Sequence, residues 1–475
     1  MPIILGSNNL VSGYEISNSM RFGGKNGNAV LQKTFSSDGN RKKFTIATWV
    51  KVHAGFMYIS GTQTSGSNYF QYGFTDDRTI RVFQGDGSLN VATNRTFGDT
   101  SAWYHIVLQI DTTQGTDSNR VKFYINGTQE TSMASTTWPN QNLDLFFNKD
   151  SHAMGVGNRG DADGAFLKGY LADYYFVDNA TVAPSTFAET DDNGIWIPKD
   201  SADVIDAVTF GTNGFFMNFQ QTGTSANSSG MGADTSGNDN HFVSTNTNAT
   251  NITTDTPSNN FCTINPNDTY ASASGTIDEG MTKLVVTTSN LHTAAGTIAP
   301  TNGKWYWEVE LDATDGSNPS NVGISNLELD DKSNMPSKLA WGYGYNASTG
   351  DKQNSGNNSS YGNSYGAGDI VGVAMDLDNG AVYFSKNGTF QASGDPTSGA
   401  TKTNAAFTWT PTGTMNWVPY VADNTSGVSF TWLLNFGNPP FAVSSSNTDG
   451  LYGNFEYAVP SGYYALCTKR LAQFG

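Results

Sequence analysis

Two apolar segments joined by an Asn-Gly turn constrain the fold of this chain more than any other feature. Residues 370–377 form an apolar run, and residues 381–385 alternate between apolar and polar positions. Between them lies Asp378-Asn379-Gly380, whose residue types tolerate the positive φ angles of a tight turn. We therefore predict an antiparallel hairpin with a buried first strand, as in a sandwich of two sheets.

The same pattern occurs earlier in the chain. The apolar segment 103–111 is followed by a polar loop and by residues 121–128, which contain Asn126-Gly127. A further Asn-Gly pair, Asn387-Gly388, follows the first hairpin. A buried strand whose partner ends in Asn-Gly therefore appears twice, which is typical of antiparallel sandwiches.

Length and composition favour two domains of this kind. The chain has 475 residues, and one all-β sandwich commonly takes about 200–250. Aromatic residues make up 12%, charged residues only 14%, and there are 52 glycines, as in a turn-rich β protein. We predict an all-β chain made of two antiparallel β-sandwiches.

The charge balance excludes some partners. With 25 basic and 42 acidic residues the formal net charge is −17, which repels nucleic acid and anionic membranes. No apolar run approaches the roughly 20 residues of a membrane span. The first residues lack the charged and apolar segments of a signal peptide, so we expect a soluble chain that is not exported.

The first half resembles the laminin-G-like, concanavalin A-like jelly roll. The resemblance covers residues 20–190 and implies a sandwich fold, but no particular ligand. We assign residues 1–244 to this domain with a C-terminal extension. The segments that carry the likeness are residues 44–50, 103–107, 121–127 and 169–176.

A linker is predicted over residues 245–260. This segment is rich in Asn, Thr and Asp and keeps only Ile252 as a core-forming residue, so it buries too little surface to hold a fold. A second domain then spans residues 261–475.

This second half resembles the SPRY domain, also an antiparallel sandwich, over residues 300–441. In that family the loops at one end of the sandwich form the binding surface. The final segment, residues 462–467, is expected to add a closing strand. The likeness is carried by residues 303–311, 321–325, 341–345, the hairpin at 370–385, and 434–441.

The pairing of the two halves is similar to virion structural proteins of marine tailed bacteriophages. The residues involved are 1–6, 211–216 and 255–266 together with both domains. This resemblance implies a fibre or appendage subunit, made in the host cytoplasm and located in the virion. Its partners would be other virion proteins and a glycan or protein on the host surface, and such subunits are usually homotrimers. A capsid or tail decoration protein that contacts other virion subunits is the alternative, and a glycan hydrolase a third.

Aromatic residues in or beside a Gly-, Asn- and Ser-rich region are the candidate ligand-binding residues. Such rings stack on sugars or fill a partner's pocket at little entropic cost. In the alternative interpretation, the segment beginning at Trp341 is a strand whose rings pack inward. The candidates are Trp341, Tyr343, Tyr345, Tyr361 and Tyr365.

Catalysis is the less favoured use of Glu308, Glu310 and Asp312. Side chains two apart on a strand lie about 6.5–7 Å apart, close to the roughly 5–5.5 Å between the carboxyls of a retaining glycosidase. The order of the acids does not match jelly-roll glycanases, however. We expect Trp305 and Trp307 to face the core and the acids to face water, and we expect no enzyme.

Calcium is the only cofactor with any sequence support. Asp76-Asp77 and the pair Asp161 and Asp163 offer clustered carboxylates in loops, although Asp-Gly turns also occur for conformational reasons. The five histidines are scattered, which argues against zinc and a catalytic triad. His105 lies in an apolar strand, and we predict a hydrogen-bonded structural histidine.

Cys262 and Cys467 leave two states open. They lie near opposite ends of the second domain, so a disulfide that closes it is geometrically allowed. Two buried free thiols are the commoner state in a chain made in a reducing cytoplasm.

Overall fold

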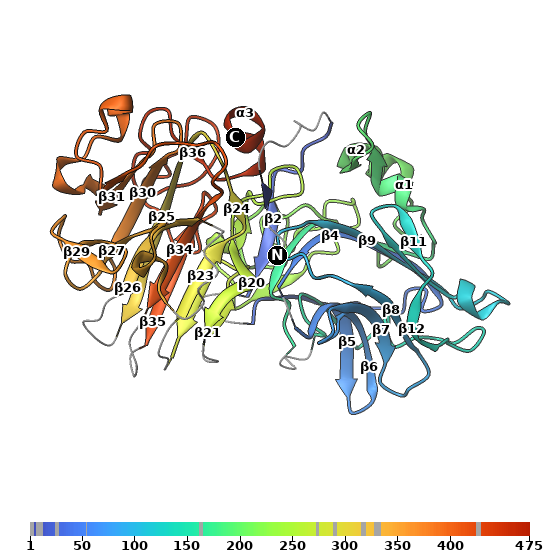
Figure 1. The fold of residues 1–475 in the computed structure, drawn as a ribbon. Helices are drawn as coiled ribbons and strands as arrows, with labels where there is room; N and C mark the ends of the chain where they lie inside the picture. The colour runs from blue at the N-terminus through green and yellow to red at the C-terminus, as the bar shows by residue number, and fades with distance from the viewer. Residues whose placement is uncertain are drawn as a thin grey trace. The chain divides into compact units, whose positions relative to one another are not determined.

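The computed structural model divides the chain into two compact units (Figure 1). Residues 11–258 form the unit that we call the first sandwich, and residues 259–475 with residues 1–10 form the second sandwich. The structure describes residues 4–5, 13–23, 28–53, 55–160, 165–271, 275–287, 292–314, 320–326, 334–423 and 429–475.

The first sandwich is built from two sheets of eight strands each. The strand order in one sheet is β11 (Thr128–Glu130), β10 (Val121–Ile125), β9 (Tyr104–Asp111), β4 (Lys43–Val52), β14 (Gly169–Asp178), β2 (Ser19–Phe22) and β19 (Ile252–Thr253), and β17 (Phe215–Met217) pairs with β14. The order in the other is β12 (Met133–Thr137), β8 (Asn90–Thr96), β7 (Thr79–Gln84), β6 (Asn68–Phe74), β5 (Met57–Ser65), β13 (Ala153–Val156), β3 (Val30–Thr34) and β18 (Val243–Thr245).

Strand β4 shows that the sheet from β11 to β19 is apolar on both faces. Phe44 and Ile46 belong to the core between the two sheets. On the opposite face Ala47 and Trp49 are also buried. Short elements cover that face, so its side chains are shielded as well: α1 (Pro184–Phe187), β15 (Ala188–Thr190), β16 (Trp196–Pro198) and α2 (Ser201–Ala207). Two 3₁₀ turns complete the unit, η1 (Asp117–Asn119) and η2 (Ala249–Asn251).

The second sandwich has sheets of seven and nine strands. The first contains, in order, β20 (Ile264–Ala271), β23 (His292–Gly296), β34 (Trp417–Asp423), β26 (Ser320–Asn326), β27 (Gly342–Asn346), β28 (Lys352–Asn354) and β29 (Asn357–Ser359). The other contains β21 (Gly275–Asp278), β22 (Lys283–Val286), β35 (Phe430–Asn435), β25 (Lys304–Thr314), β30 (Ile370–Asp376), β31 (Ala381–Lys386) and β32 (Thr389–Phe390), with β33 (Phe407–Thr408) on β31 and β36 (Tyr464–Ala465) on β25.

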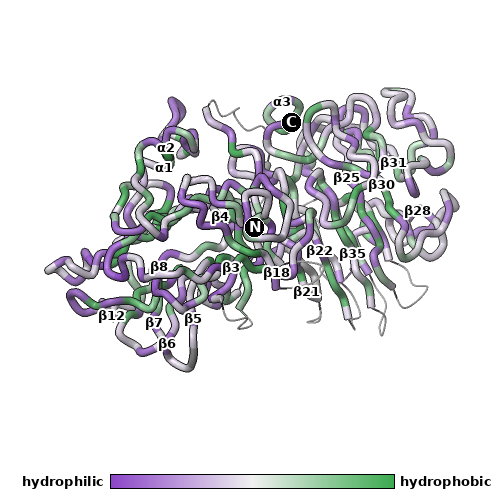
Figure 2. Tube along the Cα trace, turned by 180° about the vertical axis from the view of Figure 1, so that it is seen from behind, coloured by the Kyte–Doolittle hydropathy of each residue, from purple (hydrophilic) through white to green (hydrophobic). Residues whose placement is uncertain are grey.

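Short elements complete this unit. They are the pair β1 (Ile4–Leu5) and β24 (Ile298–Ala299), the 3₁₀ turns η3 (Pro336–Lys338), η4 (Gln391–Ser393) and η5 (Pro396–Thr401), and α3 (Thr468–Phe474). Figure 2 shows hydrophobic residues along strands such as β31 and β35. The predicted fold class, all-β with two sandwiches, is confirmed.

Both predicted hairpins are present, although in the turn at residues 378–380 only Gly380 has positive φ, at 72°. Strands β30 and β31 pair from Val371 with Lys386 to Asp376 with Ala381. In the earlier copy β9 pairs with β10, and β10 turns back to β11 through Asn126-Gly127. Both residues of that turn have positive φ, 47° and 80°, as do Asn387 and Gly388, at 48° and 78°. Positive φ at both central residues is the type I′ geometry that favours Asn-Gly.

The prediction of a linker over residues 245–260 is wrong. Residues 252–253 form β19, which pairs with β2 of the first sandwich. Asp255 is fully buried and accepts a 2.9 Å hydrogen bond and ion pair from the buried Lys51, and its other carboxylate oxygen accepts from Trp103 at 3.2 Å. Polar residues hold this segment in place, so its lack of apolar residues was misleading. The compact unit ends at residue 258 rather than 244.

The C-terminal segment covers a face of β25 that we expected to be solvated. Strand β36 pairs with β25 and is the closing strand that the sequence predicted. Phe455 of the same segment packs against Tyr306, with ring centroids 5.3 Å apart. Glu308 is consequently fully buried rather than exposed, which corrects the prediction for this residue. Glu310 and Asp312 are half-buried.

Candidate functional site

Trp341 is an exposed aromatic residue immediately before β27. Its side chain is 41% exposed, and it lies in the turn between η3 and β27. Asn354 of β28 fixes this turn, since its side-chain amide donates to the carbonyl oxygens of Leu339, Ala340 and Gly342 at 3.3, 2.9 and 3.0 Å. The Trp341 carbonyl also accepts from the backbone N–H of Asn326 at 3.1 Å. The ring is therefore presented on a well-held backbone.

A stack of aromatic rings surrounds Tyr343 of β27, two residues further along the chain. The ring of Tyr343 is stacked on Phe407 with centroids 4.7 Å apart, and on Trp409 and Trp417 at 5.5 and 5.6 Å. Tyr343 is thus held in an aromatic layer of the second sandwich.

The four tyrosines predicted to bind ligand are buried, which corrects that part of the prediction. Their exposed fractions do not exceed 8%. The hydroxyl of Tyr345 donates to the Asn363 carbonyl, and that of Tyr365 to the Tyr345 carbonyl at 2.8 Å. Burial raises the pKa of all four hydroxyls. The alternative interpretation, a strand from Trp341 with inward rings, is correct for Tyr343 and Tyr345 but wrong for Trp341, which is at the surface. Tyr361 and Tyr365 are also inside.

Glu308 makes structural contacts. One carboxylate oxygen accepts from the Tyr306 hydroxyl at 3.1 Å and the Tyr457 N–H at 2.8 Å. The other accepts from the Asn435 amide at 3.1 Å and the Glu456 N–H at 2.9 Å. Burial raises the pKa of Glu308, and the donated hydrogen bonds oppose that rise. The carboxylate joins β25 to the C-terminal segment.

The predicted calcium ligands are not brought together where the structure describes them. Asp76 and Asp77 are exposed in the turn between β6 and β7. Asp161 and Asp163 lie outside the described residues. Within the described ranges, no group of three or more His, Cys, Asp or Glu side chains could hold a metal ion.

His105 and the two cysteines are buried. His105 accepts a 3.1 Å hydrogen bond from the Trp196 indole and is 1% exposed, so the prediction of a structural histidine is confirmed. Burial lowers the pKa of His105 to about 3. Cys262 and Cys467 are free thiols, and burial raises the pKa of Cys467 to about 12. Of the two states left open by the sequence, the free one is present.

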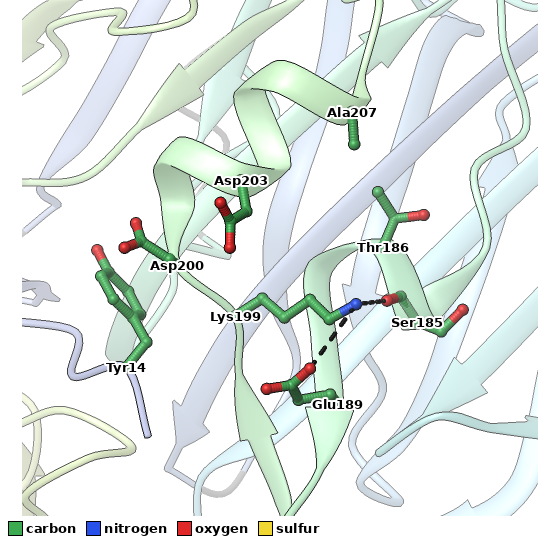
Figure 3. A pocket seen from close by; sticks show the side chains of 8 residues that line it. All are labelled: Tyr14, Ser185, Thr186, Glu189, Lys199, Asp200, Asp203 and Ala207. Carbon is green, nitrogen blue, oxygen red and sulfur yellow. Dashed lines mark hydrogen bonds and ion pairs between the residues drawn. The ribbon is translucent and has the colours of Figure 1, made fainter. Parts of the chain in front are cut away.

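A polar pocket of about 660 Å³ lies on the first sandwich beside α1 and α2 (Figure 3). Lys199 donates to the Ser185 carbonyl at 2.8 Å and lies 3.8 Å from Glu189. Asp200 and Asp203 line the same pocket. The sequence did not single out these residues, because they come from short elements without a motif. Their charges are partly paired within the pocket, so the arrangement points to no particular ligand.

No described helix has both the length and the hydropathy needed to cross a membrane. Comparison of the sequence with curated proteins gives no match.

Two family comparisons match the two halves of the chain. Residues 22–184 match the concanavalin A-like lectin/glucanases superfamily, in its laminin G type. Residues 304–408 match the SPRY domain. Both lie within the ranges predicted from the sequence.

Solved structures with similar folds include the SPRY domain of human HERC1, with 16% identity, a TM-score of 0.30, and coverage of 36% of this chain and 96% of that chain. A heptameric SAP-like pentraxin from Limulus polyphemus has 17% identity, a TM-score of 0.27, and coverage of 36% of this chain and 80% of that chain. These scores are too low to support an inference about function. The family matches and the two observed sandwiches together identify a chain that carries a laminin-G-like, concanavalin A-like domain followed by a SPRY domain.

Proposed function

We propose that this chain is a structural subunit of a tailed-phage virion, in a fibre or appendage, that binds a glycan or protein on the host surface. The similarity of the paired halves to such virion proteins supports the setting. The two domain types support the binding role, because sandwich domains of both kinds often serve as binding modules. Binding uses loops at the rim of a sandwich and involves no reaction.

The observation that carries the proposal is the exposed Trp341. Tryptophan is among the residues that dominate binding energy at interfaces, because its large ring loses little conformational freedom on contact. Asn354 holds the turn of Trp341 by three hydrogen bonds, so the backbone is organised before a partner arrives. The indole face offers a surface for a sugar ring or an apolar side chain.

Replacing Trp341 by alanine tests this role. We expect purified Trp341→Ala protein to compete against virion adsorption to host cells about tenfold or more weakly than the unmodified protein, as loss of a binding hot spot does. Because the side chain is 41% exposed, the free energy of unfolding should change by no more than about 1 kcal/mol. The measurement is competition by the purified protein against virion adsorption, with thermal unfolding recorded in parallel.

Leu451→Ala is the matched control, since Leu451 is an apolar residue of the same sandwich and is 61% exposed. It should compete as well as the unmodified protein. Equal competition by the Trp341 variant would contradict the binding role.

Imaging of intact virions tests the setting. Density at the distal end of a tail or capsid appendage is expected. Density lying flat on capsid or tail subunits would instead identify a decoration protein, and Trp341 would then be an assembly contact.

A further inference from the structure

Six side chains of the first sandwich form a closed cluster of rings and guanidinium groups. Cation–π contacts place Arg81 5.7 Å from Phe56 and 5.0 Å from Phe83, and Arg159 5.6 Å from Tyr58 and 4.3 Å from Tyr69. Two ring contacts link the two arginine groups to each other: the ring centroids of Phe56 and Tyr58 are 5.1 Å apart, and those of Tyr69 and Phe83 are 5.9 Å apart. We call this group the arginine–aromatic cluster: Phe56, Tyr58, Tyr69, Arg81, Phe83 and Arg159.

The cluster lies on the face of its sheet that points away from the core. In β6 the core contains Phe70 and Tyr72, and in β7 it contains Ile80 and Val82. Side chains alternate between the faces of a strand, so the neighbouring Tyr69, Arg81 and Phe83 project from the opposite face. That face is not fully covered, since Phe56 is 37% exposed. Tyr69, Arg81 and Phe83 are half-buried.

Arg81 brings a positive charge to this face without forming an ion pair with any described acid. Among the residues that the structure describes, Arg81 has no ion-pair partner, and Asp76 acts on it only from beyond ion-pair distance. Arg95 on neighbouring β8 provides the contrast, because it is paired with Glu130 at 2.8 Å. In a chain with a net charge of −17, Arg81 therefore places a positive charge on this face of the sheet. Such a site favours an anionic ligand.

The position within the sheet restricts what that ligand can be. Strands β5, β6 and β7 are interior strands, and the edges of their sheet are β12 and β18. Their backbone groups are paired on both sides, so a peptide cannot bind here by adding a strand. Recognition must use ring faces and a guanidinium. A sugar ring with a carboxylate matches both, because its C–H face stacks on aromatic rings and its carboxylate accepts two hydrogen bonds from arginine.

We propose that the arginine–aromatic cluster binds an acidic sugar residue of a polysaccharide, with the sugar carboxylate on Arg81 and the sugar ring on the aromatic side chains beside it. This site is additional to the rim-loop site proposed around Trp341, because it lies on a sheet face. The inference rests on the proposed binding role only for the setting in which such a glycan is met, and it concerns the sandwich that does not contain Trp341.

The test is calorimetric titration of the full-length protein with oligogalacturonate. Carboxyl-reduced oligogalacturonate and polyglutamate are titrated in parallel. We expect binding of oligogalacturonate that weakens with salt, and at least tenfold weaker binding of the reduced oligosaccharide and of polyglutamate. Absence of binding, or equal binding of either comparison compound, would overturn the proposal; equal binding of polyglutamate would point to acidic peptides.

Two variants with the same change of net charge locate the site. Arg81→Gln should weaken oligogalacturonate binding by about tenfold or more, whereas Arg95→Gln on the adjacent strand should leave it unchanged. Phe83→Leu, which keeps an apolar side chain at this position, should weaken binding through the lost stacking surface. Equal effects of Arg81→Gln and Arg95→Gln would show a non-specific charge effect and overturn the site.

The result is separable from the test of the proposed function. Binding that depends on Arg81 would stand even if imaging contradicted a fibre or appendage location. An adsorption defect of Trp341→Ala without any oligogalacturonate binding would overturn this inference and leave the proposed function supported.

Discussion

At the scale of single residues, Asp173 is a buried carboxyl group that is costly to ionise. It lies at a break in the register between β14 and β4, has a φ of 45°, and is 3% exposed. Burial, with a further contribution from Asp200, raises the pKa of Asp173 to about 8. Because the folded state holds the proton more tightly than the unfolded chain, the stability linked to this group is greatest at acid pH and is lost as pH rises to about 8.

Asp173→Asn should therefore stabilise the protein in neutral and alkaline solution. Asparagine keeps the shape, tolerates the left-handed backbone and carries no charge. We expect a gain of about 2–4 kcal/mol at pH 8 that shrinks toward pH 5, measured by denaturant unfolding across this range. Asp203→Asn, which removes a charge at the surface of α2, should not give this pH-dependent gain. An unchanged stability at pH 8 would show that Asp173 is readily ionised in the fold.

At the scale of elements, Glu308 joins β25 to the segment that covers it. All four hydrogen bonds to its carboxylate are donated by other groups. In Glu308→Gln one oxygen becomes an NH₂ group that faces donors and cannot accept from them. We expect a loss of about 2–4 kcal/mol in the free energy of unfolding, since buried donors are left unsatisfied.

Glu456→Gln is the control for that change. Its carboxylate accepts hydrogen bonds from Ser444 at the surface, so the cost should stay below about 1 kcal/mol. Similar stabilities of the two variants would show that Glu308 does not hold the C-terminal segment. Chemical denaturation followed by tryptophan fluorescence suits this comparison, because Trp305 and Trp307 precede Glu308 on β25.

At the scale of the whole molecule, the extent of the first sandwich can be tested with fragments. We expect residues 11–258 to fold alone and to unfold cooperatively, because they form one compact unit. A fragment of residues 11–244 lacks β19 and the buried carboxylate of Asp255, which accepts from Lys51. Losing one partner of a buried ion pair costs about 3–5 kcal/mol, so its melting temperature in calorimetry should be clearly lower.

Asp255→Asn in the full chain keeps this prediction testable if the shorter fragment fails to fold. It should destabilise the first sandwich in the same direction. Equal melting temperatures of the two fragments would support the linker that the sequence suggested.

Much of the fold could be predicted from local patterns. Asn126-Gly127 and Asn387-Gly388 specify their turns because few other pairs adopt positive φ at both positions. The alternation in residues 44–50 and the burial of His105 followed from apolar neighbours in the sequence. These features depend on adjacent residues, so one chain segment contains all the information.

The candidate site could be predicted only in part. Tyr361 and Tyr365 lie among Gly, Asn and Ser, which are residues typical of exposed loops, but strands from elsewhere in the chain cover both rings. Glu308 alternates with tryptophans as a solvated residue would, yet a segment about 150 residues later encloses it. The arginine–aromatic cluster combines residues from β5 and its approach, β6, β7 and the loop after β13, and no single segment contains its pattern.

The sequence by itself therefore determined the two β-sandwiches, their order along the chain and the conformation of their tight turns. The tertiary structure decided which faces are covered, where the first sandwich ends and which polar groups are buried together. The physical reason is that local backbone preferences act between neighbouring residues, whereas burial and charge pairing depend on which distant segments pack against them.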